Sequence, residues 1–336
     1  MPAAGLTKES SLSAIAHLGF EQAIQRLRAM DHEHLQAYHA MYSSWLGGIV
    51  TDPALMLIPI DDHMVHRGDG VFEAFQCRQG GVYLLERHLD RLADSAAMIG
   101  LEWPLPRADL RDAILETIRA SGRRECIIRL YISRGPGDFT PQPDTTLGSQ
   151  LYIVITDYKA KEAVKYEQGC RVQTSRIPVK KTFFANVKSC NYLPNVLMKK
   201  EAVEAGVDYT LSLDENGFIG EGGTENFALI SQDNEFLIPG FERILKGTTM
   251  IRMMELAQGL VQTGELAGVR QTGLKPEDAH QAREMLIFGT TASVLPAVEY
   301  DGRPIGTGKP GPFQKRFFEL LQADMTQNPA MITKVW

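Results

Sequence analysis

The apolar runs of this 336-residue chain have the length of β-strands, and they alternate with segments that carry the spacing of amphipathic helices. The longest runs, such as LYIVI at 151–155, are too short to cross a bilayer. The segment 86–101 has an apolar helical face that Gly100 can end, and 107–121 has a similar pattern. This alternation predicts an α+β fold, and the chain is long enough for two medium-sized domains.

The polar and weakly patterned segment 158–167 is the expected boundary between those domains. We predict an N-terminal helical extension at 1–40, a smaller α/β domain at 41–157 and a larger domain at 168–336. The segments expected in the smaller domain are strands at 55–60, 126–135 and 151–157 and a hairpin at 70–85 around Gly80-Gly81. Those expected in the larger domain are strands at 171–175, 207–230 and 284–302 and helices at 192–205, capped by Asn191, and 250–260.

Charge and cysteine content narrow the class of protein. The chain has 35 Lys and Arg against 41 Asp and Glu, a net charge of −6, which gives no reason to expect a nucleic-acid or membrane partner. The cysteines at 77, 126, 170 and 190 have no zinc or redox spacing and indicate reduced thiols. The N-terminus lacks the regions of a secretory signal, so we expect a cytoplasmic protein. His32, His34 and His39 fit a solvated helix face better than a metal site, and no metal is predicted.

Two small hydroxyl-rich turns are candidates for binding a phosphate. KGTTM at 246–250 precedes a predicted helix, and FGTTAS at 288–293 separates two predicted strands. Exposed amides at a helix N-terminus or in a glycine-containing turn suit a phosphate, and threonine hydroxyls add donors. Taken alone, such turns are more often only turns. The four hydroxyls are those of Thr248, Thr249, Thr290 and Thr291.

Four other residues each admit a structural and a chemical interpretation. Glu221, in GFIGEGGTENF, is either a turn carboxylate or a partner for a cofactor's ring nitrogen, as pyridoxal phosphate requires. Arg91, in RHLDRL, either pairs with Asp94 or holds a phosphate with its planar fork. Tyr192 is a core aromatic or a hydrogen-bond partner of a ligand's phenolic oxygen. Lys188 stands alone just before the helix at 192–205, whereas Lys199 and Lys200 lie within that helix.

Six segments in this order resemble the class IV aminotransferases, which are fold-type IV pyridoxal-phosphate enzymes. The group includes branched-chain and D-amino-acid transaminases and aminodeoxychorismate lyase, and the resemblance covers about residues 40–320. The N-terminal part of the match further resembles a D-amino-acid-transaminase-like branch of plant plastids. The segments are HRGDGVFEA (66–74), RHLDRL (87–92), VKSCNYLPNVLMKKEA (187–202), GFIGEGGTENFAL (217–229), ILKGTTMIRMMELA (244–257) and EMLIFGTTASVLPAVEYDGRPIGTGKPGP (284–312).

The resemblance assigns a role to each candidate. It implies that Lys188 carries the cofactor as a Schiff base, that Glu221 meets its pyridine nitrogen and that Tyr192 lies near its phenolic oxygen. It implies phosphate contacts from Arg91 and from the threonine turns at Thr248, Thr249, Thr290 and Thr291. It also implies two domains with the cofactor in the cleft between them, a ping-pong exchange between an amino acid and a 2-oxo acid, and a homodimer whose loops complete the neighbouring site.

The substrate is less well indicated. Phe72 and Glu73 match a segment that lines the substrate pocket in the resembled family, and Glu73 favours a transaminase over the lyase. Ala74 and the residues after it differ from the branched-chain members. Arg134, at the end of a predicted strand, either binds the substrate carboxylate or is structural. Three functions stay open: a transaminase of branched-chain or D-amino acids, a lyase that releases pyruvate from aminodeoxychorismate, and a cofactor-binding protein of another function.

Overall fold

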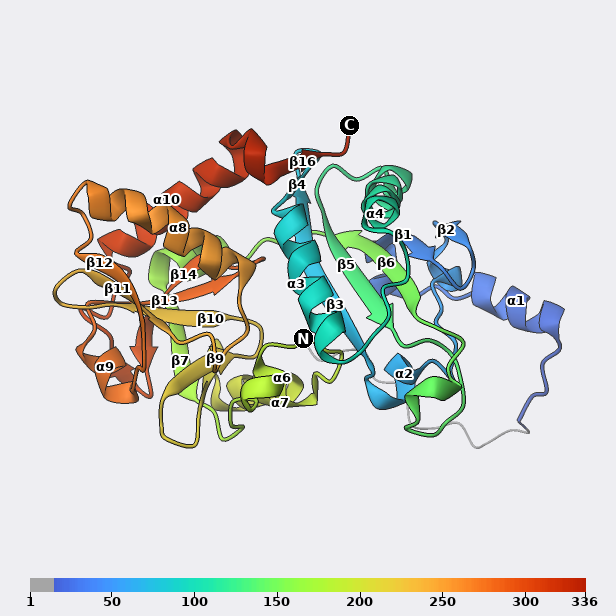
Figure 1. Ribbon diagram of the computed structural model, residues 1–336, viewed down its shortest axis with the longest axis horizontal. Helices are drawn as coiled ribbons and strands as arrows, with labels where there is room; N and C mark the ends of the chain where they lie inside the picture. Colours follow the sequence, from blue (N-terminus) through green and yellow to red (C-terminus); the bar gives the residue numbers. More distant parts are fainter. Residues whose placement is uncertain (1–14) are drawn as a thin grey trace.

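The computed structural model describes residues 15–336, apart from the side chain of Thr182. The chain forms two β-sheets that lie side by side, each with helices packed against it (Figure 1). The predicted α+β class is therefore confirmed. No helix among the described residues combines the length and the apolar character that crossing a membrane requires. Part of the predicted N-terminal extension, residues 1–14, lies outside the described range.

The first sheet has seven strands in the order β16-β4-β3-β5-β6-β1-β2, and every neighbouring pair in it is antiparallel. Helices α3 (Leu85–Met98) and α4 (Arg107–Ser121) cover one of its faces and form a continuous apolar core with it. The opposite face is turned toward the second half of the molecule. The strands contributed by the first half of the chain are β1 (Tyr38–Ser43), β2 (Gly48–Val50), β3 (Gly70–Arg78), β4 (Gly81–Tyr83), β5 (Cys126–Ser133) and β6 (Gln150–Asp157).

The second sheet is mixed, with the strand order β12-β11-β10-β13-β14-β7-β8-β9 and β15 added beside β14. Helices α8 (Thr248–Gln262) and α10 (Pro312–Gln327) pack on one face, while α9 (Pro276–Gln281) contributes to the core on the other. Helix α7 (Leu193–Ala205) packs beside β8. The strands are β7 (Cys170–Thr174), β8 (Tyr209–Leu213), β9 (Ile219–Gly222), β10 (Asn226–Ile230), β11 (Glu235–Pro239), β12 (Gly268–Thr272), β13 (Glu284–Gly289), β14 (Ser293–Tyr300) and β15 (Arg303–Pro304).

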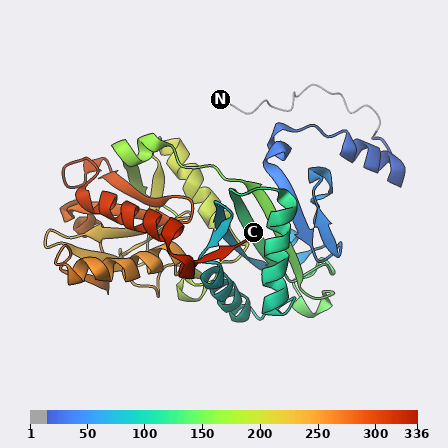
Figure 2. The ribbon, with the colours of Figure 1, turned by 90° about the horizontal axis from the view of Figure 1, so that it is seen from above.

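The C-terminal strand does not stay with the second half of the chain. β16 (Ile332–Lys334) pairs antiparallel with β4 and so completes the edge of the first sheet (Figure 2). The backbone N–H of Val335 donates to the carbonyl of Gly80 at 3.0 Å, and Arg124 lies over the ring of Trp336. The sequence predicts that residues 168–336 all belong to the larger domain. The pairing of β16 with β4 corrects this, because Ile332–Lys334 form part of the first sheet.

Several element predictions need correction. No strand forms at 55–60, where a short 3-10 helix at Pro53–Leu55 is followed by irregular backbone, and Pro59 within the segment lacks the N–H that a strand ladder needs. The expected linker at 158–167 runs into helix α5 (Ala163–Gln168). Asn191 does not cap α7; Tyr192 occupies the N-cap position.

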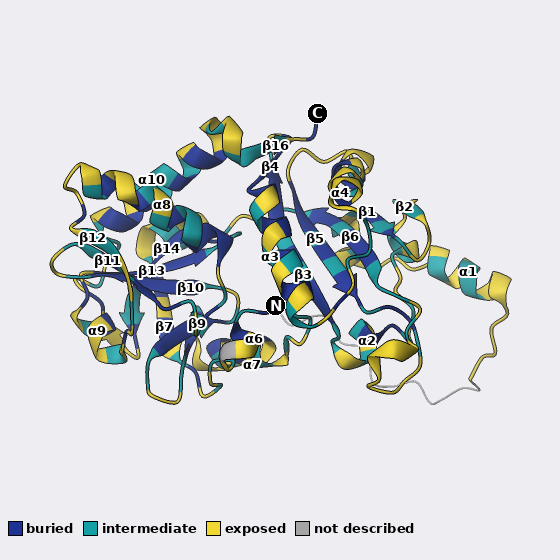
Figure 3. Ribbon diagram, in the orientation of Figure 1, coloured by how far each residue is buried: buried dark blue, intermediate teal, exposed yellow. Residues whose placement is uncertain are grey.

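The N-terminal segment is largely exposed. Helix α1 (Phe20–Arg28) has no buried residue, in contrast to the strands of both sheets (Figure 3). It ends well before residue 40, and after a 3-10 turn at Glu33–Ala37 the chain enters β1 at Tyr38. The predicted helical extension is thus shorter than expected, and the first strand was not predicted.

Candidate active site

A cavity of about 270 Å³ lies between the two halves of the molecule. The first half contributes Phe72 and Ala74 of β3, Arg91 of α3 and Arg129 of β5. The second half contributes most of the residues singled out in the sequence, although they come from separate segments. They are Lys188, Tyr192, Glu221, Thr248, Thr249, Thr290 and Thr291.

Lys188 lies in an extended segment just before α7 and is held by the first half of the molecule. Its carbonyl accepts the backbone N–H of Phe72 at 2.9 Å, and its own N–H donates to Ser95 Oγ at 3.2 Å. Its Nζ lies 4.5 Å from the centroid of the Phe72 ring and 5.8 Å from that of Tyr192. Burial, followed by the nearby Arg91 guanidinium, lowers the pKa of Lys188 to about 8. A substantial neutral fraction is therefore present at the pH of a cell.

Glu221, on β9, approaches the cavity from the second sheet. Burial raises the pKa of this carboxyl to about 7, while the backbone N–H of Leu245, which donates to Oε2 at 3.0 Å, acts in the other direction. A carboxyl with this pKa changes its ionisation easily. A ligand nitrogen that binds a proton next to it would shift it to the carboxylate form.

A third part of the cavity lining has the properties of an anion site, and we call it the anion corner. It comprises Thr248 and Thr249 at the start of α8, the turn at 290–291, and Arg91. Helix α8 begins there, so Thr248 and Thr249 present backbone N–H groups that have no partner inside the helix. At the cap residue Gly247, a Cβ would lie 1.9 Å from Asn226 Oδ1, so a side chain there requires the Asn226 amide or the turn to shift. The turn containing Thr290 and Thr291, between β13 and β14, faces the same space.

Arg91 completes the anion corner, and it forms an ion pair with Glu73, a residue that was assigned to the substrate pocket from the sequence. Its Nε and Nη2 donate to the two carboxylate oxygens of Glu73 at 2.6 and 2.8 Å, and Nη1 donates to the carbonyl of Lys246 at 3.0 Å. Glu73 has no exposed surface and does not line the cavity. The prediction that Glu73 contacts the substrate is wrong, because successive residues of β3 point to opposite faces and only Phe72 and Ala74 face the cavity.

Arg134 has a structural environment. Its Nε and Nη2 bind both carboxylate oxygens of Asp69, at 2.6 and 3.0 Å, and its remaining contacts are the carbonyls of Ile99 and Gly100. It does not line the cavity. The assignment of Arg134 to the substrate carboxylate is corrected accordingly.

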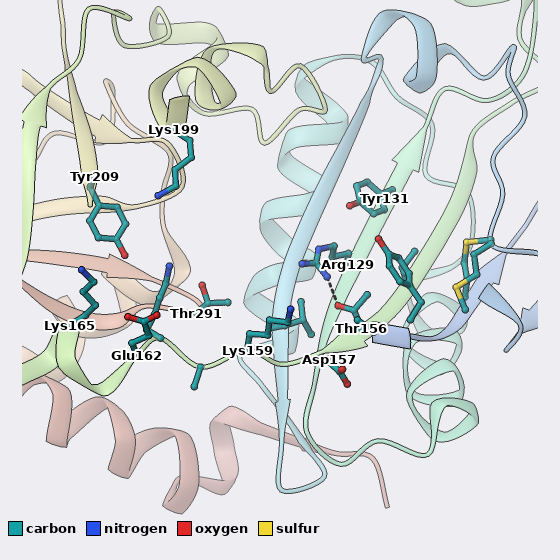
Figure 4. Close-up of a pocket in the computed structure, with 18 of the residues that line it drawn as sticks. Arg129, Tyr131, Thr156, Asp157, Lys159, Glu162, Lys165, Lys199, Tyr209 and Thr291 are labelled. Atoms are coloured by element: carbon teal, nitrogen blue, oxygen red, sulfur yellow. Dashed lines mark hydrogen bonds between the residues drawn. The ribbon is translucent and has the colours of Figure 1, made fainter. Parts of the chain in front are cut away.

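Two cations that the sequence did not single out line the cavity instead. Arg129 is on the face of β5 that looks toward the second half, and it also lines a larger, adjoining cavity of about 880 Å³. Figure 4 shows this larger cavity, with Arg129 bonded to Thr156 and with Thr291 across from it. Lys180 lines the smaller cavity, 5.0 Å from the centroid of the Tyr192 ring, and burial lowers its pKa. The available signal for Arg129 was a charge in the middle of an apolar strand, CIIRLYIS.

Comparison with known proteins identifies the family. Residues 70–300 match the model of the amino-transferase class IV family. The chain belongs to this family, and its cofactor is pyridoxal 5'-phosphate.

Among curated proteins, similar sequences are named either D-amino-acid transaminase or branched-chain-amino-acid aminotransferase. The chain is 39% identical over 298 residues to a chloroplastic D-amino-acid transaminase of Arabidopsis thaliana, covering 88% of this chain and 79% of the relative. It is 33% identical over 278 residues to a putative branched-chain-amino-acid aminotransferase of Methanocaldococcus jannaschii, covering 83% and 94%.

Solved structures of branched-chain amino acid aminotransferases have the same fold. The enzyme of Escherichia coli superimposes with a TM-score of 0.82 at 25% identity, over 89% of this chain and 100% of the other. A second such enzyme, solved with pyridoxamine 5'-phosphate, also superimposes with a TM-score of 0.82, at 26% identity over 89% of this chain and 99% of the other.

Proposed function

We propose that this aminotransferase moves an amino group between an amino acid and a 2-oxo acid in a ping-pong exchange, with Lys188 as the reacting lysine. The observation that carries the proposal is one cavity, of about 270 Å³, lined by a lysine of lowered pKa, a buried carboxyl and the N-terminus of α8. These three groups come from distant parts of the sequence. Their meeting suits a ligand with an aldehyde, a ring nitrogen and a phosphate.

The donor set fits pyridoxal phosphate from end to end. Arg91, together with the backbone N–H groups of Thr248 and Thr249 and the hydroxyls of Thr249, Thr290 and Thr291, would hold the phosphate. Glu221 would lie at the ring nitrogen and Tyr192 near the phenolic oxygen. When bound, the cofactor supplies an electron sink for the bonds at the substrate's α-carbon.

Lys188 has the properties of a proton carrier in this setting. With a pKa of about 8, its amine can both accept a proton from the substrate α-carbon and return one. The backbone contacts to Phe72 and Ser95 fix the lysine segment, so the Nζ moves mainly by rotation of its own side chain. With the cofactor bound, Glu221 would be ionised beside the ring nitrogen and would favour its protonated form, which is the form that withdraws electrons.

The substrate is proposed to be a branched-chain or a D-amino acid, a choice supported by the names of the curated relatives. In this chain Phe72 and Ala74 present an apolar wall, and Arg129 and Lys180 are the two cations in the cavity besides Arg91 and Lys188 among the described residues. We assign them to the substrate's carboxylate in place of Arg134, since neither has a carboxylate partner among the ion pairs of the described chain.

A homodimer and a cytoplasmic location are part of the proposal. Large apolar side chains are exposed along α6 (Thr182–Ala185) and α7, with Phe183, Phe184, Leu193, Val196 and Leu197 among them, as expected for a surface that meets another chain. The four cysteines are free thiols, which agrees with a reducing compartment. Light scattering of the purified protein and fractionation of the source cells test the two statements.

The test of the function is a half-reaction survey. The holoenzyme is mixed with L- and D-amino acids in turn, the change in cofactor absorbance is followed, and the oxo-acid product is identified. We expect conversion with branched-chain or D-amino acids, followed by restoration with a 2-oxo acid. Release of pyruvate from aminodeoxychorismate without an amino acceptor would instead identify the lyase. Borohydride reduction should fix the cofactor on the peptide containing Lys188, and a Lys188→Ala variant should show no such attachment.

A further inference from the structure

A fully buried acidic residue lies behind the anion corner of the cavity, where a negative charge is unexpected. Glu73 has no exposed surface, and its carboxylate is bound by two side chains, Arg91 through two hydrogen bonds and His88 through one. Despite burial, those two neighbours hold the pKa of Glu73 well below its usual range. The carboxylate is thus a permanent charge at the back of a site that receives another anion.

The geometry of Arg91 explains what this charge does. A guanidinium has five N–H groups in a fixed plane. Two are taken by Glu73 and one by the carbonyl of Lys246, which leaves one on Nη1 and one on Nη2. Because Arg91 lines the cavity, this remaining edge is available to a ligand there. A bidentate partner at the rear fixes the plane of the guanidinium, so the free edge keeps one direction.

His88 extends the same arrangement to α8. Its Nδ1 lies 2.7 Å from Glu73 Oε2 and its Nε2 lies 3.4 Å from Thr248 Oγ1. Glu73, being ionised, can only accept, so Nδ1 carries the hydrogen. Burial lowers the pKa of His88, so the ring is neutral and Nε2 accepts from the Thr248 hydroxyl. Thr248 is left to offer its backbone N–H to the cavity, whereas the hydroxyl of Thr249 has no protein partner in the described structure.

We infer that Glu73 and His88 are positioning residues for the cofactor phosphate: Glu73 fixes the free edge of Arg91 directly and, through His88, the start of α8. The inference rests on the proposed arrangement of the cofactor in the cavity. It assigns no contact between Glu73 and either substrate or cofactor. If Glu73 acts in this way, the affinity for the phosphate depends more on the orientation of the Arg91 guanidinium than on the net charge around it.

The test compares two ligands that differ only in the phosphate. Apo-protein is titrated with pyridoxal 5'-phosphate and with pyridoxal, and the ratio of their dissociation constants measures the phosphate contribution. The variants are Glu73→Gln, which removes the charge, and Glu73→Asp, which keeps the charge but shortens its reach. His88→Gln is the third variant, and it leaves the Arg91–Glu73 ion pair intact. Asp324→Asn is the matched control, because Asp324 is also buried and makes a bidentate pair with Arg252 away from the cavity.

A positioning role predicts that both Glu73 variants reduce the preference for the phosphorylated ligand by about tenfold or more, His88→Gln by less, and Asp324→Asn not at all. A purely electrostatic role predicts the reverse for Glu73→Gln, namely a larger preference, since a negative charge near the phosphate has been removed. A larger or unchanged preference in Glu73→Gln, or a wild-type preference retained in Glu73→Asp, therefore overturns the inference. If Glu73→Gln does not fold, Glu73→Asp and His88→Gln decide the question.

Borohydride reduction at Lys188 tests the proposed function separately from the role of Glu73. If wild-type protein forms no borohydride-stable link to Lys188, the proposed chemistry is wrong whatever the variants do. If the link forms and wild-type protein prefers the phosphorylated ligand, the ratios of the variants judge the inference alone. A wild-type protein that binds both ligands equally would contradict the phosphate corner itself, and with it the inference.

Discussion

The carbonyl of Lys188 accepts the backbone N–H of Phe72 at 2.9 Å, so the lysine of the second half of the chain is fastened to a strand of the first. Val71 and Ser189 form an isolated antiparallel bridge at the same place. The two halves thus meet at the residue that faces the cavity. A movement that separated Lys188 from the apolar wall at Phe72 would have to break this hydrogen bond and the bridge beside it.

The buried amine of Lys188 should cost stability in the apo-protein. Its pKa is lowered, so between about pH 8 and its ordinary value the unfolded chain binds more protons than the folded one, and stability rises with pH in that range. Below pH 8 the full cost is present. Lys188→Met should therefore raise the free energy of unfolding at pH 7 by about 1–3 kcal/mol, and the gain should fade above about pH 10. Urea unfolding at the two pH values measures this.

Lys200 provides the control for that experiment. It lies on the exposed side of α7 and pairs with Glu204 at 3.0 Å. Lys200→Met should change stability by less than about 1 kcal/mol at either pH. A stabilisation of Lys188→Met that is the same at neutral and at alkaline pH would show that packing, not charge, is responsible.

Glu221 is expected to act on rate more than on cofactor attachment. Glu221→Gln keeps the shape and can still accept the Leu245 N–H, but it cannot carry the negative charge that favours a protonated ring nitrogen. Single-turnover half-reactions should slow on the order of 10²-fold, while the cofactor stays attached to Lys188. Glu225 also lines the cavity, and its carboxylate is occupied by Thr224. Equal losses in Glu221→Gln and Glu225→Gln would contradict a specific role.

Variants of Arg129 and of Arg134 together test which arginine binds the substrate carboxylate. Arg129→Gln removes a cation from the cavity and should raise KM for the amino acid roughly tenfold or more, with cofactor affinity little changed. Arg134→Gln breaks the ion pair with Asp69 and should lower the melting temperature while leaving KM near the wild-type value. Steady-state kinetics and thermal unfolding on both variants separate the two effects. A KM change confined to Arg134→Gln would restore the original assignment.

Two glycines of the α8 region test the anion corner by sterics. A Cβ at Gly247 would lie 1.9 Å from Asn226 Oδ1, so Gly247→Ala must shift either the Asn226 side chain, which binds the carbonyl of Leu245, or the start of α8, and should weaken cofactor binding by about tenfold or more. Gly259, inside the same helix, has nothing within 4 Å of its Cβ position. Gly259→Ala should stabilise the protein by about 0.5–1 kcal/mol without affecting the cofactor. Fluorescence titration and urea unfolding give the two readings.

The sequence was sufficient for elements whose pattern is local. Helix 107–121 was predicted with the bounds that the structure has, because its apolar spacing and the following glycine both lie within or beside the segment. The threonine turns, Lys188 and Glu221 were candidates on local sequence, and the resemblance to the class IV aminotransferases, carried by six segments in order, supplied their roles. Their convergence on one cavity agrees with the predicted roles, which the experiments above test.

The failures concern orientation and long-range pairing. Glu73 follows Phe72 directly, so the two could not both face the cavity from one strand, and the alternation rule alone would have separated them. The position of Arg129 in the middle of an apolar strand was a local signal, but the ion pair that engages Arg134 was not visible in the sequence, because Asp69 supplies its carboxylate from a distant loop. β16 was missed for a similar reason, because its three residues form a strand only when β4 is beside them.

The pairing of β16 with β4 also affects the order in which the molecule can be completed during synthesis. β4 lies in the first quarter of this chain, whereas its partner β16 occupies Ile332–Lys334. During synthesis, β16 is therefore made only after all strands of the second sheet. Over that time the edge of β4 lacks the strand that covers it in the finished protein. Folding of the first half therefore cannot finish as an independent event, and the newly made enzyme completes its two halves together.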